Sequence, residues 1–201
     1  RKLPFYLQWG SGVESRVRFG VLPDRHAACG RENFINKLCC EGVMNLDLLK
    51  SELIRDEGFR EMPYRCTAGK LTTGVGRNLD DNPLTPEEIK VVGHDGRSEK
   101  ITLEAATYLL ESDIRRTCEA LDRALPWWKT LDEVRRRVLV NMAFNLGISR
   151  LLGFHTTLGW IKQGNYTAAA GEMLLSLWAR QVKGRATRLA QMMRTGVASG
   201  G

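Results

Sequence analysis

Residues 102–125 limit the fold more than any other part of the chain. Their apolar residues keep a helical period for over twenty positions: Leu103, Ala106, Leu109, Leu110, Ile114, Cys118, Leu121 and Leu125. Such a period predicts one long helix with a continuous apolar face. A helix of this length can join two lobes of a small protein.

The segments on the two sides of this helix differ in pattern. Beyond Pro126 the periodic segments are all helical, at 131–146, 154–163, 166–178 and 185–193. Before it, residues 64–75 predict a hairpin, and residues 85–88 predict a helix start with a capping box. We therefore expect an α+β fold of two lobes, with a small antiparallel hairpin sheet in the first lobe, a connecting helix and a helical second lobe.

Residues 1–43 lack this periodicity, with Gly, Pro, Arg and aromatic residues scattered along them. We expect an N-terminal appendage whose order and function the sequence does not give. The domain should then cover residues 44–199, as a hairpin-containing lobe (44–101), the connecting helix (102–125) and a helical lobe (126–199).

Composition excludes several classes of protein. With 201 residues, of which 43% are hydrophobic, the chain can bury one substantial core or two small lobes. It has no apolar run near the roughly 18 residues that suggest a membrane span. Its N-terminal stretch also lacks the basic-then-apolar pattern of a secretory signal. We expect no stable membrane insertion and an export route of another kind.

The cysteines do not follow a metal-binding pattern. They are odd in number and match no zinc spacing: Cys29, Cys39, Cys40, Cys66 and Cys118. We expect neither a disulfide scaffold nor a metal site, so the simplest expectation for each is a free or buried thiol.

The net charge of +7 is concentrated in the second lobe, where eleven Lys and Arg stand against three Asp and Glu from Trp127 onward. A basic surface attracts polyanions in general, so charge alone does not choose between nucleic acid, acidic lipid and bacterial cell-wall polymer. Because no nucleic-acid-binding motif accompanies this charge, we expect no nucleic-acid partner. Trp127, Trp128 and Trp178 are expected to pack in the core.

Glu57 is a carboxylate at the end of an apolar helix face. Leu46, Leu49 and Leu53 mark that face, and Glu57 follows Leu46 by eleven positions, which returns to nearly the same direction on a helix. An apolar surrounding disfavours the charged form of a carboxylic acid, which suits a general acid acting near neutral pH. The alternative is a Glu57 that only pairs with a neighbouring arginine.

Cys66 and Thr72 lie in the predicted hairpin. With a three-residue loop they would face each other across the strands. Hydrolysis with inversion needs a water held on the far side of the sugar, which a hydroxyl and a thiol can position together. A neutral thiol is a weak base, so its role is positioning unless local positive charge ionises it. The alternatives are an ordinary strand residue at 72 and a small half-buried one at 66.

The spacing of Glu57, Cys66 and Thr72 resembles the signature of the phage lysozyme family related to the lysozyme of T-even phages. That signature is Glu, eight residues, Asp or Cys, five residues, Thr. The similarity covers nearly all of residues 44–197 and includes LDEVRRRVLVNMAFNLG (131–147), Gly153-Phe154, Trp178 and GRATRLAQMMRTG (184–196).

This resemblance implies a glycoside hydrolase, a muramidase that cleaves the β-1,4 bond between N-acetylmuramic acid and N-acetylglucosamine without a cofactor. It matches Glu57 to the general acid, Thr72 to the water-binding hydroxyl and Cys66 to the position often held by Asp. The residues that it matches to the saccharide cleft are Arg77, Phe144, Asn145 and Phe154.

This sequence departs from the T-even enzyme at three of these positions. Asn145 stands where that enzyme has Gln, and Arg77 stands where it has a cleft-edge His. The departure at Cys66 matters most, because a neutral thiol cannot stabilise an oxocarbenium-like centre as a carboxylate does.

The resemblance further implies a monomer whose partner is bacterial peptidoglycan. It would be made in the host cytoplasm, act on the wall from the periplasm and lyse the host at phage release. The alternative is a catalytically weak wall-binding module whose basic helical lobe holds the polymer.

Redox control of Cys66 is also implied, because some exported relatives with Cys at this position are held inactive by a disulfide. Cys39 or Cys40 can reach Cys66 if residues 41–46 fold back. The appendage lacks the long apolar anchor of those relatives, and the alternative is that both are incidental thiols.

Overall fold

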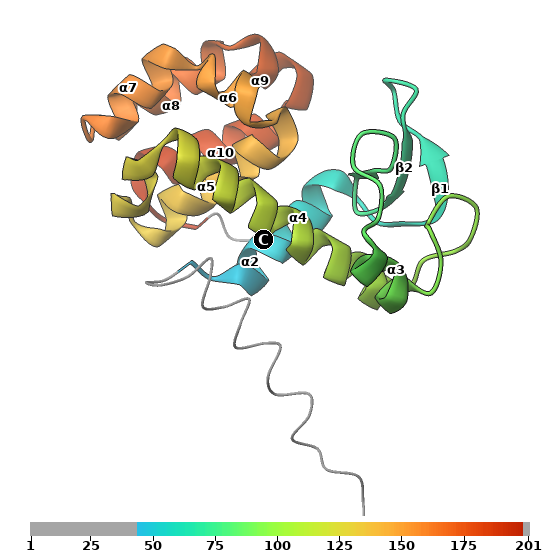
Figure 1. The fold of residues 1–201 in the computed structure, drawn as a ribbon. Helices are drawn as coiled ribbons and strands as arrows, with labels where there is room; N and C mark the ends of the chain where they lie inside the picture. Colours follow the sequence, from blue (N-terminus) through green and yellow to red (C-terminus); the bar gives the residue numbers. More distant parts are fainter. Residues whose placement is uncertain (1–43, 199–201) are drawn as a thin grey trace, which may run out of the picture.

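The structure is a computed structural model that describes residues 44–198. Within them the chain forms two lobes joined by a long helix (Figure 1). The first lobe holds a three-stranded antiparallel sheet and the short helix α3 (Pro86–Val92), and the second is built from helices. The predicted α+β class is confirmed. The appendage 1–43, with Cys29, Cys39 and Cys40, lies outside the described residues, so the disulfide hypothesis for Cys66 stays a hypothesis.

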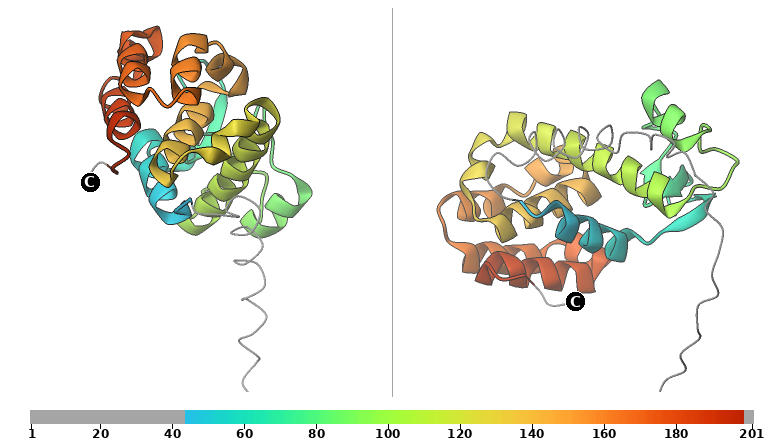
Figure 2. Two further views of the ribbon diagram at one scale, coloured as in Figure 1. Left: turned by 90° about the vertical axis from the view of Figure 1, so that its left-hand side faces the viewer. Right: turned by 90° about the horizontal axis from the view of Figure 1, so that it is seen from below.

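Helix α4 (Leu103–Ala124) is the predicted connecting helix. It begins where Thr102 accepts a hydrogen bond from the Ala105 N–H at 3.1 Å. The predicted apolar face is buried, at 1% exposure or less for Leu109, Leu110, Ile114 and Leu121. Leu103, at the outer end of the helix, is 52% exposed. Figure 2 shows α4 running from the sheet lobe to the helical lobe, with α2 (Leu46–Glu57) beside it.

The sheet has the strand order β1 (Arg60–Arg65), β2 (Leu71–Gly74) and β3 (Arg77–Asn78). The predicted three-residue loop is wrong, because residues 66–70 connect β1 to β2. Tyr64 therefore lies opposite Thr72. Cys66 lies beyond the end of β1, where its N–H donates to the Lys70 carbonyl at 2.9 Å. Gly69 completes the turn at φ +76°, a conformation that favours glycine.

The capping box predicted for α3 is confirmed. The Glu88 N–H donates to the Thr85 hydroxyl at 3.2 Å, and the Thr85 N–H donates to Glu88 Oε2 at 2.9 Å. Glu88 is 2% exposed. Inside the lobe, its carboxylate also pairs with Arg77 and Arg116.

The second lobe follows the predicted helices, with the unpredicted short helix α6 added and with shifted boundaries, among them those at 131 and 176. The 3-10 helix η2 (Pro126–Thr130) leads to helices α5 (Glu133–Leu146), α6 (Ile148–Leu152), α7 (His155–Lys162), α8 (Tyr166–Leu175), α9 (Leu177–Val182) and α10 (Gly184–Thr195). Helix α5 begins two residues later than predicted, because Asp132 caps it by accepting from the Arg135 N–H. The helix predicted at 166–178 is two helices, because Ser176 breaks it and caps α9 by accepting from the Ala179 N–H at 3.1 Å.

The tryptophans behave largely as predicted. Trp128 is 1% and Trp178 is 4% exposed, and Trp127 packs half-buried against the same core. Trp128 Nε1 donates to Asp122 at 2.8 Å, which satisfies its polar atom inside the core. Across residues 44–198, no helix is both long and apolar enough to span a membrane.

Candidate active site

Glu57 is the last residue of α2. Gly58 ends the helix at φ +75°, with its N–H donating to the Ile54 carbonyl at 2.8 Å. The Glu57 side chain is 22% exposed, and its Oε1 accepts a hydrogen bond from Arg185 Nη1 at 2.6 Å. The expectation of an apolar surrounding is thus wrong: a charged partner lies against the carboxylate. The arginine pairing stated as the alternative is thus present, and the arginine comes from α10, 128 positions away.

Two more side chains, those of Asn141 and Asp56, hold Arg185 in place. Its Nε donates to Asn141 Oδ1 at 2.9 Å and lies 3.5 Å from the carboxylate of Asp56. Asp56 also pairs with Arg188 and accepts from Asn141 Nδ2, and its side chain is only 1% exposed. The guanidinium that contacts Glu57 is therefore fixed by α2, α5 and α10 together, which fixes the orientation of the carboxylate.

Glu57 lies against Gly76, which lines a pocket between the two lobes. Gly76 lies against it so closely that a Cβ at Gly76 would be 3.6 Å from Glu57 Oε2. The same glycine lines a pocket of about 300 Å³ that is walled by β3, α4 and the corner between α5 and α6. Its lining includes Gly76, Asn78, Asp113, Thr117, Phe144 and Ile148. The carboxylate is thus one residue removed from a space shared by both lobes.

Thr72 and Cys66 meet at the turn end of the hairpin despite the altered register. Thr72 is 3% exposed, and its hydroxyl donates to the Lys70 carbonyl at 3.1 Å. Hydrogen bonds from the Ala68 and Lys70 amides lower the pKa of the Cys66 thiol, and the Thr72 hydroxyl adds to this effect. Backbone amides of the turn therefore stabilise the thiolate relative to an ordinary thiol. The sequence-based expectation was that only local positive charge would do so.

Tyr64 lies opposite Thr72 and was given no role from the sequence. Burial raises the pKa of its phenol, Arg60 opposes this, and the negative charges of Glu57 and Cys66 raise it further. Tyr64 therefore lies within electrostatic reach of both candidate catalytic groups. The Arg60 guanidinium lies over its ring, 4.2 Å from the centroid.

Arg77 lines the interlobe pocket, but its guanidinium is paired with the carboxylates of Glu88 and Asp113. The side chain is 2% exposed, with Nη2 2.7 Å from Glu88 and Nη1 2.6 Å from Asp113. Arg116 joins the same cluster through both carboxylates. Burial raises the pKa of Asp113, and Arg77 opposes this. We therefore interpret Arg77 as a support of the pocket wall.

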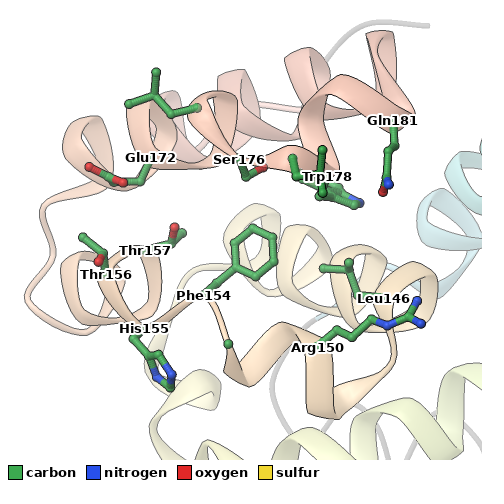
Figure 3. Close-up of a pocket in the computed structure, with 13 residues that line it drawn as sticks. Leu146, Arg150, Phe154, His155, Thr156, Thr157, Glu172, Ser176, Trp178 and Gln181 are labelled. Carbon is green, nitrogen blue, oxygen red and sulfur yellow. The ribbon is translucent and has the colours of Figure 1, made fainter.

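A second pocket, of about 630 Å³, lies within the helical lobe (Figure 3). Phe154 and Trp178 meet in it edge to face, with ring centroids 6.1 Å apart. Asn145 Oδ1 accepts from Trp178 Nε1 at 2.9 Å. The residues predicted for one cleft are thus distributed: Phe144 lines the interlobe pocket, Phe154 lines the helical-lobe pocket, and Asn145 holds Trp178 in place.

The sequence does not predict a role for Arg185 or Asn141, although both lie in the segments that carry the family resemblance. A usable signal was present, because both are polar residues on helix faces that are otherwise apolar: Arg185 is 6% and Asn141 0% exposed. A buried arginine needs an acidic partner. The sequence could not say which of the 23 Asp and Glu residues that partner was.

A two-lobed α+β fold with a carboxylate beside an interlobe pocket defines a lysozyme-like protein. Residues 55–194 match the family described as phage lysozyme. The chain belongs to the phage lysozyme family, and this membership supports a muramidase-type, peptidoglycan-degrading function.

The relatives differ in how much of their length this chain covers. The pre-baseplate central spike protein Gp5 of Enterobacteria phage T4 is 32% identical over 164 residues, which are 76% of this chain and 28% of that protein. Two probable T4-type lysozymes of Dictyostelium discoideum are 29% and 28% identical, over 74% of this chain and 94% of each relative. The chain thus spans less than a third of the spike protein and nearly all of the two Dictyostelium proteins.

Proposed function

We propose that this protein hydrolyses the β-1,4 bond between N-acetylmuramic acid and N-acetylglucosamine in bacterial peptidoglycan. The observation that carries the proposal concerns Glu57, whose carboxylate lies against Gly76 in the wall of the interlobe pocket and is oriented by Arg185 of α10. A glycosidic oxygen bound in that pocket can take a proton from Glu57 in its acid form, which is the role of the general acid.

Thr72 and Cys66 supply the second half of the reaction. Their side chains lie together on the hairpin, where Tyr64 is the cross-strand partner of Thr72. In an inverting mechanism a water is held there and attacks the anomeric carbon from the face opposite the leaving group. The sulfur of Cys66 accepts a hydrogen bond from this water. Because the turn amides lower its pKa, Cys66 ionises at a lower pH than an ordinary thiol, and in its thiolate form it opposes the positive charge that develops on the sugar.

Aromatic side chains supply the apolar contacts that sugar rings need. Phe144 does so in the interlobe pocket, and Phe154 with Trp178 does so in the helical lobe. The enzyme would act as a monomer on the cell wall, from the periplasmic side, and serve host lysis. Peptidoglycan is its partner in this proposal, and the reaction uses no cofactor.

A wall-binding module without catalysis is the weaker alternative. That alternative relied on the basic surface of the helical lobe. Of the eleven Lys and Arg residues of the helical lobe, at least three are largely buried: the side chains of Arg135, Arg137 and Arg185 are 13%, 1% and 6% exposed. The surface charge available to a polymer is correspondingly smaller.

The test is the Glu57→Gln variant, which keeps the shape of the side chain and removes the proton. Loss of the general acid should lower the rate of clearing of permeabilised Gram-negative cells by about 100- to 10,000-fold. Glu61→Gln is the matched control, because Glu61 is 62% exposed on β1 and pairs only loosely with Lys100. Clearing by Glu57→Gln at the parental rate would refute the proposal, and a parental protein that binds walls without releasing sugar would favour the binding module.

A further inference from the structure

A seam of polar contacts joins α2 to α5 along the length of α2. Glu133, Arg137 and Asn141 follow one another at four-residue intervals on α5, so they lie on one face of that helix. Each contacts α2 or its cap: the Asn45 N–H donates to Glu133 Oε1 at 2.9 Å, Arg137 Nη1 donates to Glu52 Oε1 at 2.5 Å, and Asn141 Nδ2 donates to Asp56 Oδ2 at 3.2 Å. We call these six residues the α2–α5 seam.

The central pair of the seam is deeply buried. The Arg137 side chain is 1% and the Glu52 side chain 10% exposed. Within residues 44–198, Glu52 Oε2 and Arg137 Nη2 are buried without a hydrogen-bond partner. Burial raises the pKa of Glu52, and the charge of Arg137 opposes this. Two apolar side chains of similar volume often stabilise such a position equally or better, so stability alone does not account for the pair.

A charge pair fixes the relative orientation of the two helices that it joins. Apolar contacts are non-directional and tolerate rotation or sliding of one helix on another, whereas a charge-assisted hydrogen bond fixes particular atoms. The seam ends at Asn141, which also accepts from Arg185, the residue that holds the Glu57 carboxylate. Glu52 lies on α2 five positions before Glu57. The rotation of α2 set at Glu52 therefore decides where Glu57 points.

We propose that Arg137 and Glu52 are positioning residues that fix the rotation and register of α2 and so place the Glu57 carboxylate at the interlobe pocket. This inference rests on the proposed function, because hydrolysis is the property that the position of Glu57 controls. The pair touches neither the pocket nor the substrate, and acts only through α2.

The test replaces the pair by two apolar side chains, in the variant Glu52→Met/Arg137→Met. Its kcat on soluble peptidoglycan fragments should fall about 10-fold or more, because small misplacements of a catalytic group are costly. The KM should stay within about 2-fold, since the pocket is unchanged. Its unfolding midpoint should match or exceed the parental value. A purely structural pair would change stability and leave kcat unmoved.

Arg135→Met is the matched control on the same helix. The Arg135 side chain is 13% exposed, and its Nε donates to the Met193 carbonyl of α10 at 2.8 Å. This variant should lose stability and keep the parental kcat. Arg137→Lys keeps a charge opposite Glu52, so it should retain more of kcat than the double methionine variant.

If the double variant does not fold, Glu52→Gln carries the test, with the same expected fall of kcat at constant KM. A folded double variant, or a folded Glu52→Gln, with parental kcat overturns the positioning role and leaves the proposed function standing. A parental protein without hydrolytic activity overturns the proposed function and this inference with it.

Discussion

Glu57 and Arg185 are separated by 128 positions in the chain, and their side chains meet at 2.6 Å. The contact joins the end of α2 to α10. It gives the candidate general acid a fixed orientation, because Arg185 is itself held by Asn141 and Asp56.

Arg185→Met should lower turnover more than it weakens substrate binding. The variant frees the Glu57 carboxylate to rotate, and loss of a positioned catalytic geometry costs on the order of 10- to 100-fold in rate. Arg188→Met is the control, because Arg188 pairs with the same Asp56 but does not contact Glu57. Both variants should lose stability, but only Arg185→Met should also have a lower turnover rate. Equal turnover in the two would show that Arg185 serves the fold alone. Unfolding midpoints and steady-state kinetics on soluble fragments provide the measurements.

The stereochemistry of the product tests the role of Thr72. A water held on the far side of the sugar inverts the anomeric centre, so the first product of cleaving a β bond should be the α-anomer. Proton NMR of a reaction followed before mutarotation distinguishes the two. Thr72→Val should slow turnover, whereas Thr72→Ser, which keeps the hydroxyl, should slow it less. A β-anomer as first product would point to a covalent intermediate instead.

The ionisation of Cys66 is open to a direct titration. Amide hydrogen bonds from Ala68 and Lys70, with help from the Thr72 hydroxyl, lower its pKa from the ordinary value of 9.0. The rate at which iodoacetamide alkylates Cys66 can be followed by peptide mapping. In the folded protein this rate should reach half its maximum below pH 9.0, and in urea the pH of half-maximal rate should be higher. Thr72→Val should shift the folded midpoint upward.

The same titration has a consequence for stability. Because the folded pKa of Cys66 lies below the unfolded one, its contribution to stability is present above the unfolded pKa and is lost as pH falls through the folded value. The difference in unfolding midpoint between the parent and Cys66→Ser should thus grow as pH rises between the two values. Identical alkylation midpoints in folded and unfolded protein would contradict a thiolate held by the turn.

Arg77 should contribute to stability more than to binding. Removing its guanidinium leaves Glu88 and Asp113 with only the partly exposed Arg116 as a cationic partner, which should cost up to about 3–5 kcal/mol of unfolding free energy. Lys129→Met is the surface comparison, because the Lys129–Asp122 pair has side chains 55% and 35% exposed and should cost about 1 kcal/mol or less. Urea denaturation of Arg77→Met and Lys129→Met measures both. If Arg77→Met instead weakened fragment binding without loss of stability, Arg77 would contact the substrate as first expected.

Much of the architecture follows from local pattern. The period of residues 102–125 determined α4, the capping box at Thr85 and Glu88 determined the start of α3, and the composition on the two sides of α4 determined the α+β class. These features depend on residues within a few positions of one another, so the sequence carries them directly. The boundaries at Asp132 and Ser176 were missed because a capping side chain outweighed a continuing apolar period.

The surroundings of Glu57 depended on the tertiary structure instead. Its position at the end of an apolar helix face followed from the spacing to Leu46, but that spacing cannot say which side chains approach from α10. Arg185 and Arg137 are two of the basic residues that made the second lobe look like a charged surface, and the fold buries both against carboxylates of α2. The hairpin register, which places Tyr64 and not Cys66 opposite Thr72, was likewise set by the turn around Gly69. Helical period and capping are short-range properties of a chain, whereas charge pairing and register depend on contacts between distant segments, and only the folded structure brings those together.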